Sequence, residues 1–154
     1  MCNLRVAFYD QGGLQVDVSV ERETLLDASP SEVWEAISEE SRLEEWLADE
    51  VELDLVEGGA ASFRFEDGER QGTVDAVEEE RRLALTWSRP GELPSQVEFR
   101  IEAMPAGTRL RVTESAMAIA ATVERRPTAC GLGGAAWAER LATLAGVLRL
   151  VLVA

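Results

Sequence analysis

Apolar residues occupy every second position in successive short segments between residues 14 and 112, with polar or charged residues between them. The segments carry Leu14, Val16, Val18, Val20; Val51, Leu53, Leu55; Phe63, Phe65; Val74, Ala76; Leu83, Leu85, Trp87; Val97, Phe99, Ile101; and Leu110, Val112. In an extended strand this spacing places all the apolar side chains on one face. The pattern therefore predicts an antiparallel sheet with one apolar and one charged face, and the apolar face needs a cover.

The cover is expected near the end of the chain, over residues 132–150. Trp137, Leu141, Leu144 and Leu148 recur there at helical spacing, which is typical of a helix with one apolar stripe. Between this helix and the last strand, residues 115–130 predict a strand end followed by a long loop.

Two shorter helices are predicted after the first strand. Ser29, Pro30 and Glu32 form a Ser-x-x-Glu capping box with proline at the first helical position, a pattern that marks a helix start. A second Ser-x-x-Glu box over residues 41–44 predicts that another short helix opens there.

A series of short motifs points to the same fold. It runs through Ala28-Ser29-Pro30-Ser31-Glu32-Val33-Trp34, Trp46, Gly58-Gly59, Gly72-Thr73-Val74, Arg82-Leu83-Ala84-Leu85-Thr86-Trp87, Gly107-Thr108-Arg109-Leu110 and Trp137. In this order and spacing the chain resembles the SRPBCC superfamily of START-like domains, in the branch similar to the activator of heat-shock protein 90 ATPase. The resemblance implies an α+β helix-grip fold: a curved antiparallel sheet wrapped around a long C-terminal helix, with two short helices after the first strand.

One START-like (SRPBCC) domain is expected over residues 14–154, since a chain of 154 residues is long enough for one well-packed core. Gln11, Gly12 and Gly13 separate residues 1–13 from this domain. We expect this leader to be disordered, an extra edge strand, or the product of an upstream start codon.

All 15 basic residues are arginine, and the chain contains neither lysine nor histidine. A histidine-activated nucleophile and a Schiff-base lysine are therefore excluded. The usual imidazole metal sites are absent too, and two distant cysteines cannot form a zinc site. We expect no metal and no cofactor. Any acid or base must be Asp, Glu, Cys2, Cys130 or Tyr9.

The formal net charge of −14 argues against nucleic acid and against an anionic membrane surface as partners, because both need a basic face. High solubility explains the charge most simply, and a basic protein partner is the alternative. No apolar run reaches the ~20 residues of a membrane-spanning helix, and the two cysteines fit a reducing compartment. We expect a cytoplasmic monomer or homodimer.

A sheet that grips a helix leaves a gap where the two cannot interdigitate, and such pockets are apolar with a few polar groups. We expect this gap to bind a small hydrophobic molecule. Its expected lining is Trp46, Phe63, Phe65, Leu85, Trp87, Phe99, Leu110, Val112, Trp137 and Leu141, residues that an ordinary core would also bury. Two alternatives stay open, because the superfamily hosts many functions. One is a cyclase, aromatase or hydrolase-like enzyme that uses a pocket carboxylate, and the other is a co-chaperone-like protein-interaction module.

Glu114 is the candidate for acid or base chemistry. It shares the strand parity of Thr108, Leu110 and Val112, but an inward carboxylate is costly unless it is paired or protonated. We therefore expect the strand to bend or end at Thr113, which would place Glu114 in solvent or against an arginine. An inward Glu114 is the alternative, and it would favour the enzyme.

Overall fold

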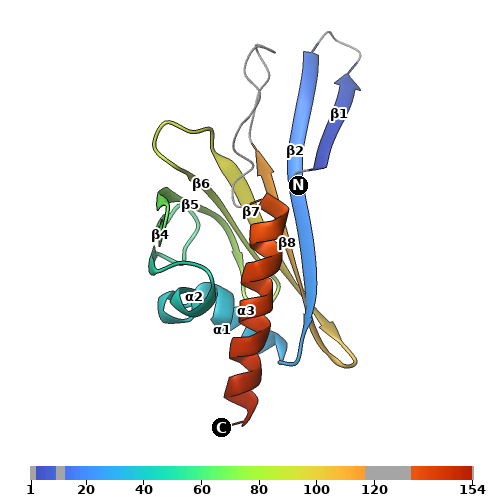
Figure 1. The fold of residues 1–154 in the computed structure, drawn as a ribbon, viewed down its shortest axis with the longest axis vertical. Helices are drawn as coiled ribbons and strands as arrows, with labels where there is room; N and C mark the ends of the chain where they lie inside the picture. Colours follow the sequence, from blue (N-terminus) through green and yellow to red (C-terminus); the bar gives the residue numbers. More distant parts are fainter. Residues whose placement is uncertain (1–2, 10–12, 117–132, 154) are drawn as a thin grey trace.

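The computed structural model describes residues 3–9, 13–116 and 133–153. In this part of the chain the elements are β1 (Asn3–Tyr9), β2 (Gly13–Leu26), α1 (Pro30–Ser38), α2 (Glu40–Trp46), β3 (Glu50–Leu53), β4 (Ala60–Phe65), β5 (Gly68–Glu78), β6 (Arg82–Ser88), β7 (Ser95–Met104), β8 (Gly107–Ala116) and α3 (Gly133–Val153). These strands form one sheet in the order β1-β2-β8-β7-β6-β5-β4-β3, with every pairing antiparallel. The helix α3 runs along one face of the sheet, with α1 and α2 beside it (Figure 1). The predicted α+β helix-grip fold is confirmed.

The strand β2 continues well beyond the predicted alternation. It reaches Leu26 because its second half pairs with β8, from Val20 opposite Glu114 to Leu26 opposite Thr108. On its other side, Asn3–Tyr9 of the leader pair with β2 as the edge strand β1.

The capping box at α1 is present as predicted, but the second box is not. At α1 the Ser29 hydroxyl accepts from the Glu32 amide, and the Glu32 carboxylate accepts from the Ser29 amide. The helix α2 begins at Glu40, two residues before the start that a cap at Ser41 predicts, and its cap residue Glu39 makes no side-chain cap hydrogen bond. Glu39 also ends α1, so the chain passes from one helix to the next through a single residue. Ser41 is therefore already inside the helix.

The strand β8 runs straight through Thr113 to Ala116, so the expected bend or end at Thr113 is wrong. Both edges of the strand remain paired there, since Ser115 lies opposite Ser19 of β2 and Gln96 of β7. Two neighbouring strands hold β8 extended, and its alternation carries Glu114 to the inner face. Residues 117–132, and with them most of the predicted loop and Cys130, lie outside the described residues.

The core lies between the inner face of the sheet and α3. The four stripe residues Trp137, Leu141, Leu144 and Leu148 are all buried, as predicted. On the sheet, Gly72 of β5 lies opposite Trp87 of β6. A Cβ at position 72 would lie 1.8 Å from the Thr86 carbonyl oxygen, so only glycine allows this close approach.

No helix in the described part of the chain is long and apolar enough to cross a membrane.

Candidate functional site

The ten residues predicted to line a pocket all point into the core, and none is more than 5% exposed. Their centre is Trp87, which stacks on Trp137 with ring centroids 6.2 Å apart and planes 18° apart. The rings of Phe63 and Phe65 meet Trp87 edge-on at 5.2 and 5.7 Å. We call Trp87, Trp137, Phe63 and Phe65 the aromatic cluster. Two of the ten predicted residues, Phe65 and Trp46, also border cavities, and contact of the whole set with a ligand stays a prediction.

Trp46 borders a small cavity of about 110 Å³ between α1, α2 and α3. Its ring meets Phe99 edge-on at 6.2 Å, and its indole N–H donates to the Ala36 carbonyl at 2.9 Å. The buried polar end of this tryptophan is thereby satisfied. The cavity is too small for most metabolites, since ligand pockets usually measure about 300–1,000 Å³.

Glu114 is buried beneath the aromatic cluster, with 2% of its surface exposed. Its Oε2 accepts hydrogen bonds from Trp87 Nε1 and from Ser95 Oγ, both at 2.7 Å. Its Oε1 accepts from Trp137 Nε1 at 3.0 Å. The carboxylate therefore ties the two stacked indoles to β8. Sequence reasoning named Glu114 but missed these donors, although a buried indole N–H needs an acceptor.

Arg70 of β5 is the buried cation opposite this carboxylate, and sequence reasoning missed it. Its side chain is 5% exposed, and its Nη1 lies 3.7 Å from Oε2 of Glu114. The guanidinium also lies 4.9 Å from the ring centroid of Trp87 and 5.3 Å from that of Phe65, distances suited to cation–π attraction. Burial lowers the pKa of Arg70, and the Glu114 charge opposes that shift. The available signal was strand parity, since Arg70 is in phase with Gly72.

A cavity of about 430 Å³ opens beside this buried pair, between the β4–β5 hairpin and the first turns of α3. It is lined by Phe65, Glu66, Asp67, Arg70, Arg89, Ala136 and Arg140. The Arg140 guanidinium lies 5.6 Å from the Phe65 ring centroid. Arg89 pairs with Asp67, and hydrogen bonding from Arg89 lowers the pKa of Asp67. We call this space the hairpin cavity; it combines an aromatic wall with three guanidinium groups.

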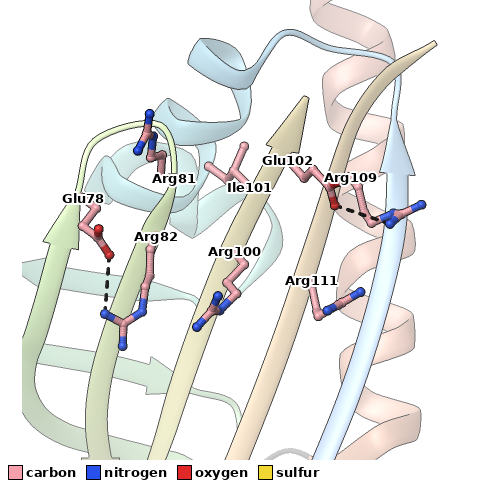
Figure 2. A pocket seen from close by; sticks show the side chains of 8 residues that line it. All are labelled: Glu78, Arg81, Arg82, Arg100, Ile101, Glu102, Arg109 and Arg111. Carbon is pink, nitrogen blue, oxygen red and sulfur yellow. Dashed lines mark hydrogen bonds and ion pairs between the residues drawn. The ribbon is translucent and has the colours of Figure 1, made fainter. Parts of the chain in front are cut away.

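A second hollow of about 420 Å³ lies on the sheet face that α3 does not cover (Figure 2). Its lining is Glu78, Arg81, Arg82, Arg100, Ile101, Glu102, Arg109 and Arg111. Four of these arginines form ion pairs with carboxylates in the described part of the chain: Arg82 with Glu78 and Glu98, Arg100 with Glu98, Arg109 with Glu102, and Arg111 with Glu21 and Glu23. The charges of this outer hollow are thus largely satisfied by the protein itself.

No curated protein matches the chain. Among solved structures, MLL2253 from Mesorhizobium loti is 25% identical with a TM-score of 0.73, over 85% of this chain and 96% of that one. CalU16 from Micromonospora echinospora is 26% identical with a TM-score of 0.66, over 97% and 83% of the two chains.

The Aha1 dimer from Colwellia psychrerythraea is 20% identical with a TM-score of 0.68, over 85% of this chain and 96% of that one, a likeness of fold alone. The family model described as activator of Hsp90 ATPase homolog 1-like protein matches residues 27–148. The match spans α1 through most of α3 and so includes the aromatic cluster, Glu114 and the hairpin cavity. The chain therefore belongs to the activator of Hsp90 ATPase homolog 1-like family, within the SRPBCC superfamily.

Proposed function

We propose that this domain binds a small molecule with a hydrophobic body between the sheet and α3, in the hairpin cavity. The observation that carries the proposal is the cavity itself. Its volume of about 430 Å³ falls within the range of ligand pockets. Phe65 offers an aromatic wall from β4, and Ala136 of α3 leaves room opposite it because its side chain is small.

The aromatic cluster supports the proposal by giving the cavity a rigid base. Phe65 packs on Trp87, and Trp87 packs on Trp137. Both indoles are fixed by the Glu114 carboxylate. Rigid aromatic walls reduce the conformational entropy lost on binding. Glu114 itself is assigned to this supporting role, because its two oxygens already accept three hydrogen bonds and face Arg70. We therefore favour binding over a carboxylate-based reaction.

A protein-interaction role is the second candidate. What favours it is that the ten residues predicted to line a pocket all belong to the packed core, and eight of them border neither the hairpin cavity nor the small cavity beside Trp46. The family description also names an ATPase activator. In this case the hairpin cavity would have no ligand. The cytoplasmic location and the monomeric or homodimeric state stay predictions; the Aha1 relative was solved as a dimer.

Titration with N-phenyl-1-naphthylamine, a neutral apolar fluorophore, separates the two candidates. The folded protein should bind one molecule of this probe. The variant Ala136→Trp fills the cavity and should weaken binding by about tenfold or more, a change of roughly 1.4 kcal/mol. The matched control Ala138→Trp alters an exposed position two residues along the same helix and should bind as the wild type does.

Thermal unfolding of both variants shows whether the fold is retained. Probe binding only to partly unfolded protein would contradict the proposal. Equal binding by folded Ala136→Trp and wild-type protein would also contradict it, because the probe would then occupy another place.

A further inference from the structure

Arg70 is a buried cation whose hydrogen-bonding capacity is not used by the described part of the chain. A guanidinium carries five N–H donors, yet within the described residues none accepts a hydrogen bond from Arg70. Its Nε is buried without a partner, and the 3.7 Å separation from Glu114 is an ion pair longer than a hydrogen bond. Buried hydrogen-bond donors are nearly always paired with an acceptor. Because the Arg70 side chain is 95% buried and lines the hairpin cavity, we expect a molecule bound in that cavity to supply the acceptor.

Arg140 of α3 is a second arginine of the hairpin cavity whose charge has no carboxylate partner in the described part of the chain. It lines the hairpin cavity and contacts the Phe65 ring. The chain has 29 acidic residues for 15 arginines. At the outer hollow, four of the five lining arginines pair with carboxylates in the described part of the chain, and Figure 2 shows the pairs Arg82–Glu78 and Arg109–Glu102. Within the described residues, two arginines whose N–H groups have no side-chain acceptor thus lie beside one aromatic ring, that of Phe65.

We propose that the ligand of the hairpin cavity is an apolar carboxylic acid. Its carboxylate is held by Arg70 and Arg140, and its apolar body contacts Phe65 and Ala136. This inference rests on the proposed function and adds the chemical class of the ligand. The planar fork of arginine matches a carboxylate, and charge-assisted hydrogen bonds of this kind are about twice as strong as neutral ones.

A single negative charge fits this cavity better than a phosphate dianion. Glu66 and Asp67 border the same cavity, and the chain as a whole carries a charge of −14. Both repel a second negative charge on the ligand. Arg89 is already paired with Asp67, so it holds the hairpin together and is left out of the proposed carboxylate contact.

The test compares decanoate with 1-decanol, which has the same ten-carbon chain without the charge. Each is used to displace N-phenyl-1-naphthylamine from the wild-type protein at neutral pH. Decanoate should displace the probe at about tenfold lower concentration, as expected for hydrogen bonds to a charged group. The variant Arg140→Gln should lose this preference and keep its affinity for decanol.

Arg64→Gln is the matched control. Arg64 is the neighbour of Phe65 on β4, but it is exposed and pairs with Glu50. This variant removes the same charge outside the cavity and should keep the preference for decanoate. Arg70→Lys retains the ion pair with Glu114 but lacks the planar fork, and should reduce the preference; if it fails to fold, Arg140→Gln still decides the question.

Equal displacement by decanol and decanoate in the wild type would overturn the carboxylate inference and leave the proposed function standing. Equal loss of preference in Arg64→Gln and Arg140→Gln would also overturn it, since the effect would then be one of overall charge. Failure of the probe and of both ten-carbon compounds to bind would overturn the proposed function together with the inference.

Discussion

Replacing Glu114 by Gln should be among the most destabilising conservative substitutions in this domain. The glutamine side chain has nearly the same shape, but it has one oxygen where the carboxylate has two. In either orientation its amide group faces an indole N–H, of Trp87 or of Trp137, that now donates to the carboxylate. That indole loses its carboxylate acceptor, with only Ser95 Oγ at 3.1 Å left as a partner in the case of Trp87, and Arg70 loses the buried carboxylate that faces it.

The size of the effect follows from burial. The side chains of Arg70 and Glu114 are 5% and 1% exposed, so water cannot replace the lost contacts. Removing one partner of a buried ion pair costs about 3–5 kcal/mol, and an unsatisfied buried donor alone costs about 1–3 kcal/mol. We expect a loss of about 3–5 kcal/mol, a large part of the roughly 5–15 kcal/mol that stabilises a typical domain.

Urea unfolding followed by far-UV circular dichroism at pH 7 measures the loss. The control is the double variant Arg70→Met with Glu114→Gln, because replacing both members of a buried pair is often close to neutral. It should recover at least half of the stability lost in Glu114→Gln, giving a clear coupling energy in a double-mutant cycle. A loss below about 1 kcal/mol in Glu114→Gln, or additive effects in the cycle, would refute the reasoning.

Three further predictions concern pH, the helix α3 and nucleic acid. Desolvation opposes the charge of Glu98, but hydrogen bonds from Arg100 and Arg82 and their charges outweigh it, so the pKa of Glu98 lies below its ordinary 4.5. Glu98→Gln should therefore cost about 0.5–1 kcal/mol at pH 7, and this difference should disappear as the pH falls through the lowered pKa; a difference that is unchanged in acid would contradict the ion pairs. Deleting residues 137–154 should give insoluble or molten protein, because the apolar sheet face loses its cover; a soluble truncation with a cooperative thermal transition would show that α3 is not the cover. A low-salt gel shift with mixed DNA and RNA should show no complex at micromolar protein, given the charge of −14; salt-sensitive retention would contradict this.

Most of the fold could be predicted because it depends on local patterns. The alternation of apolar residues marked each strand from β3 to β8, and the Trp137–Leu148 spacing marked the covering face of α3. The α1 start was visible because its cap uses side chains three residues apart. The start of α2 was not, because the chain turns at Glu39, which ends one helix and begins the next.

The site could be predicted only in part because it joins distant segments. The aromatic residues were foreseen from strand parity, but parity alone does not show which polar groups meet. Glu114 was expected in solvent or against an arginine, because an isolated buried carboxylate is costly. It is buried, and the charge of Arg70 from β5 and the N–H groups of two indoles compensate the carboxylate there. The same parity rule applied to Arg70, in phase with Gly72, would have revealed the partner.

The hairpin cavity could not be predicted from the sequence, and the reason is a different one. Its volume depends on how closely the β4–β5 hairpin approaches α3, and that distance is set by packing across the whole core. Arg89, directly after β6, and Arg140 of α3 line it from positions far apart in the chain, and no short motif links them.

A crystal structure of the protein with decanoate tests the central claim most directly. The account predicts the ten-carbon chain against Phe65 and Ala136, with the carboxylate at hydrogen-bond distance, about 2.7–2.9 Å, from Arg140 or Arg70. Decanoate bound elsewhere on the protein, or a hairpin cavity that stays empty under conditions where binding in solution is saturated, would contradict it.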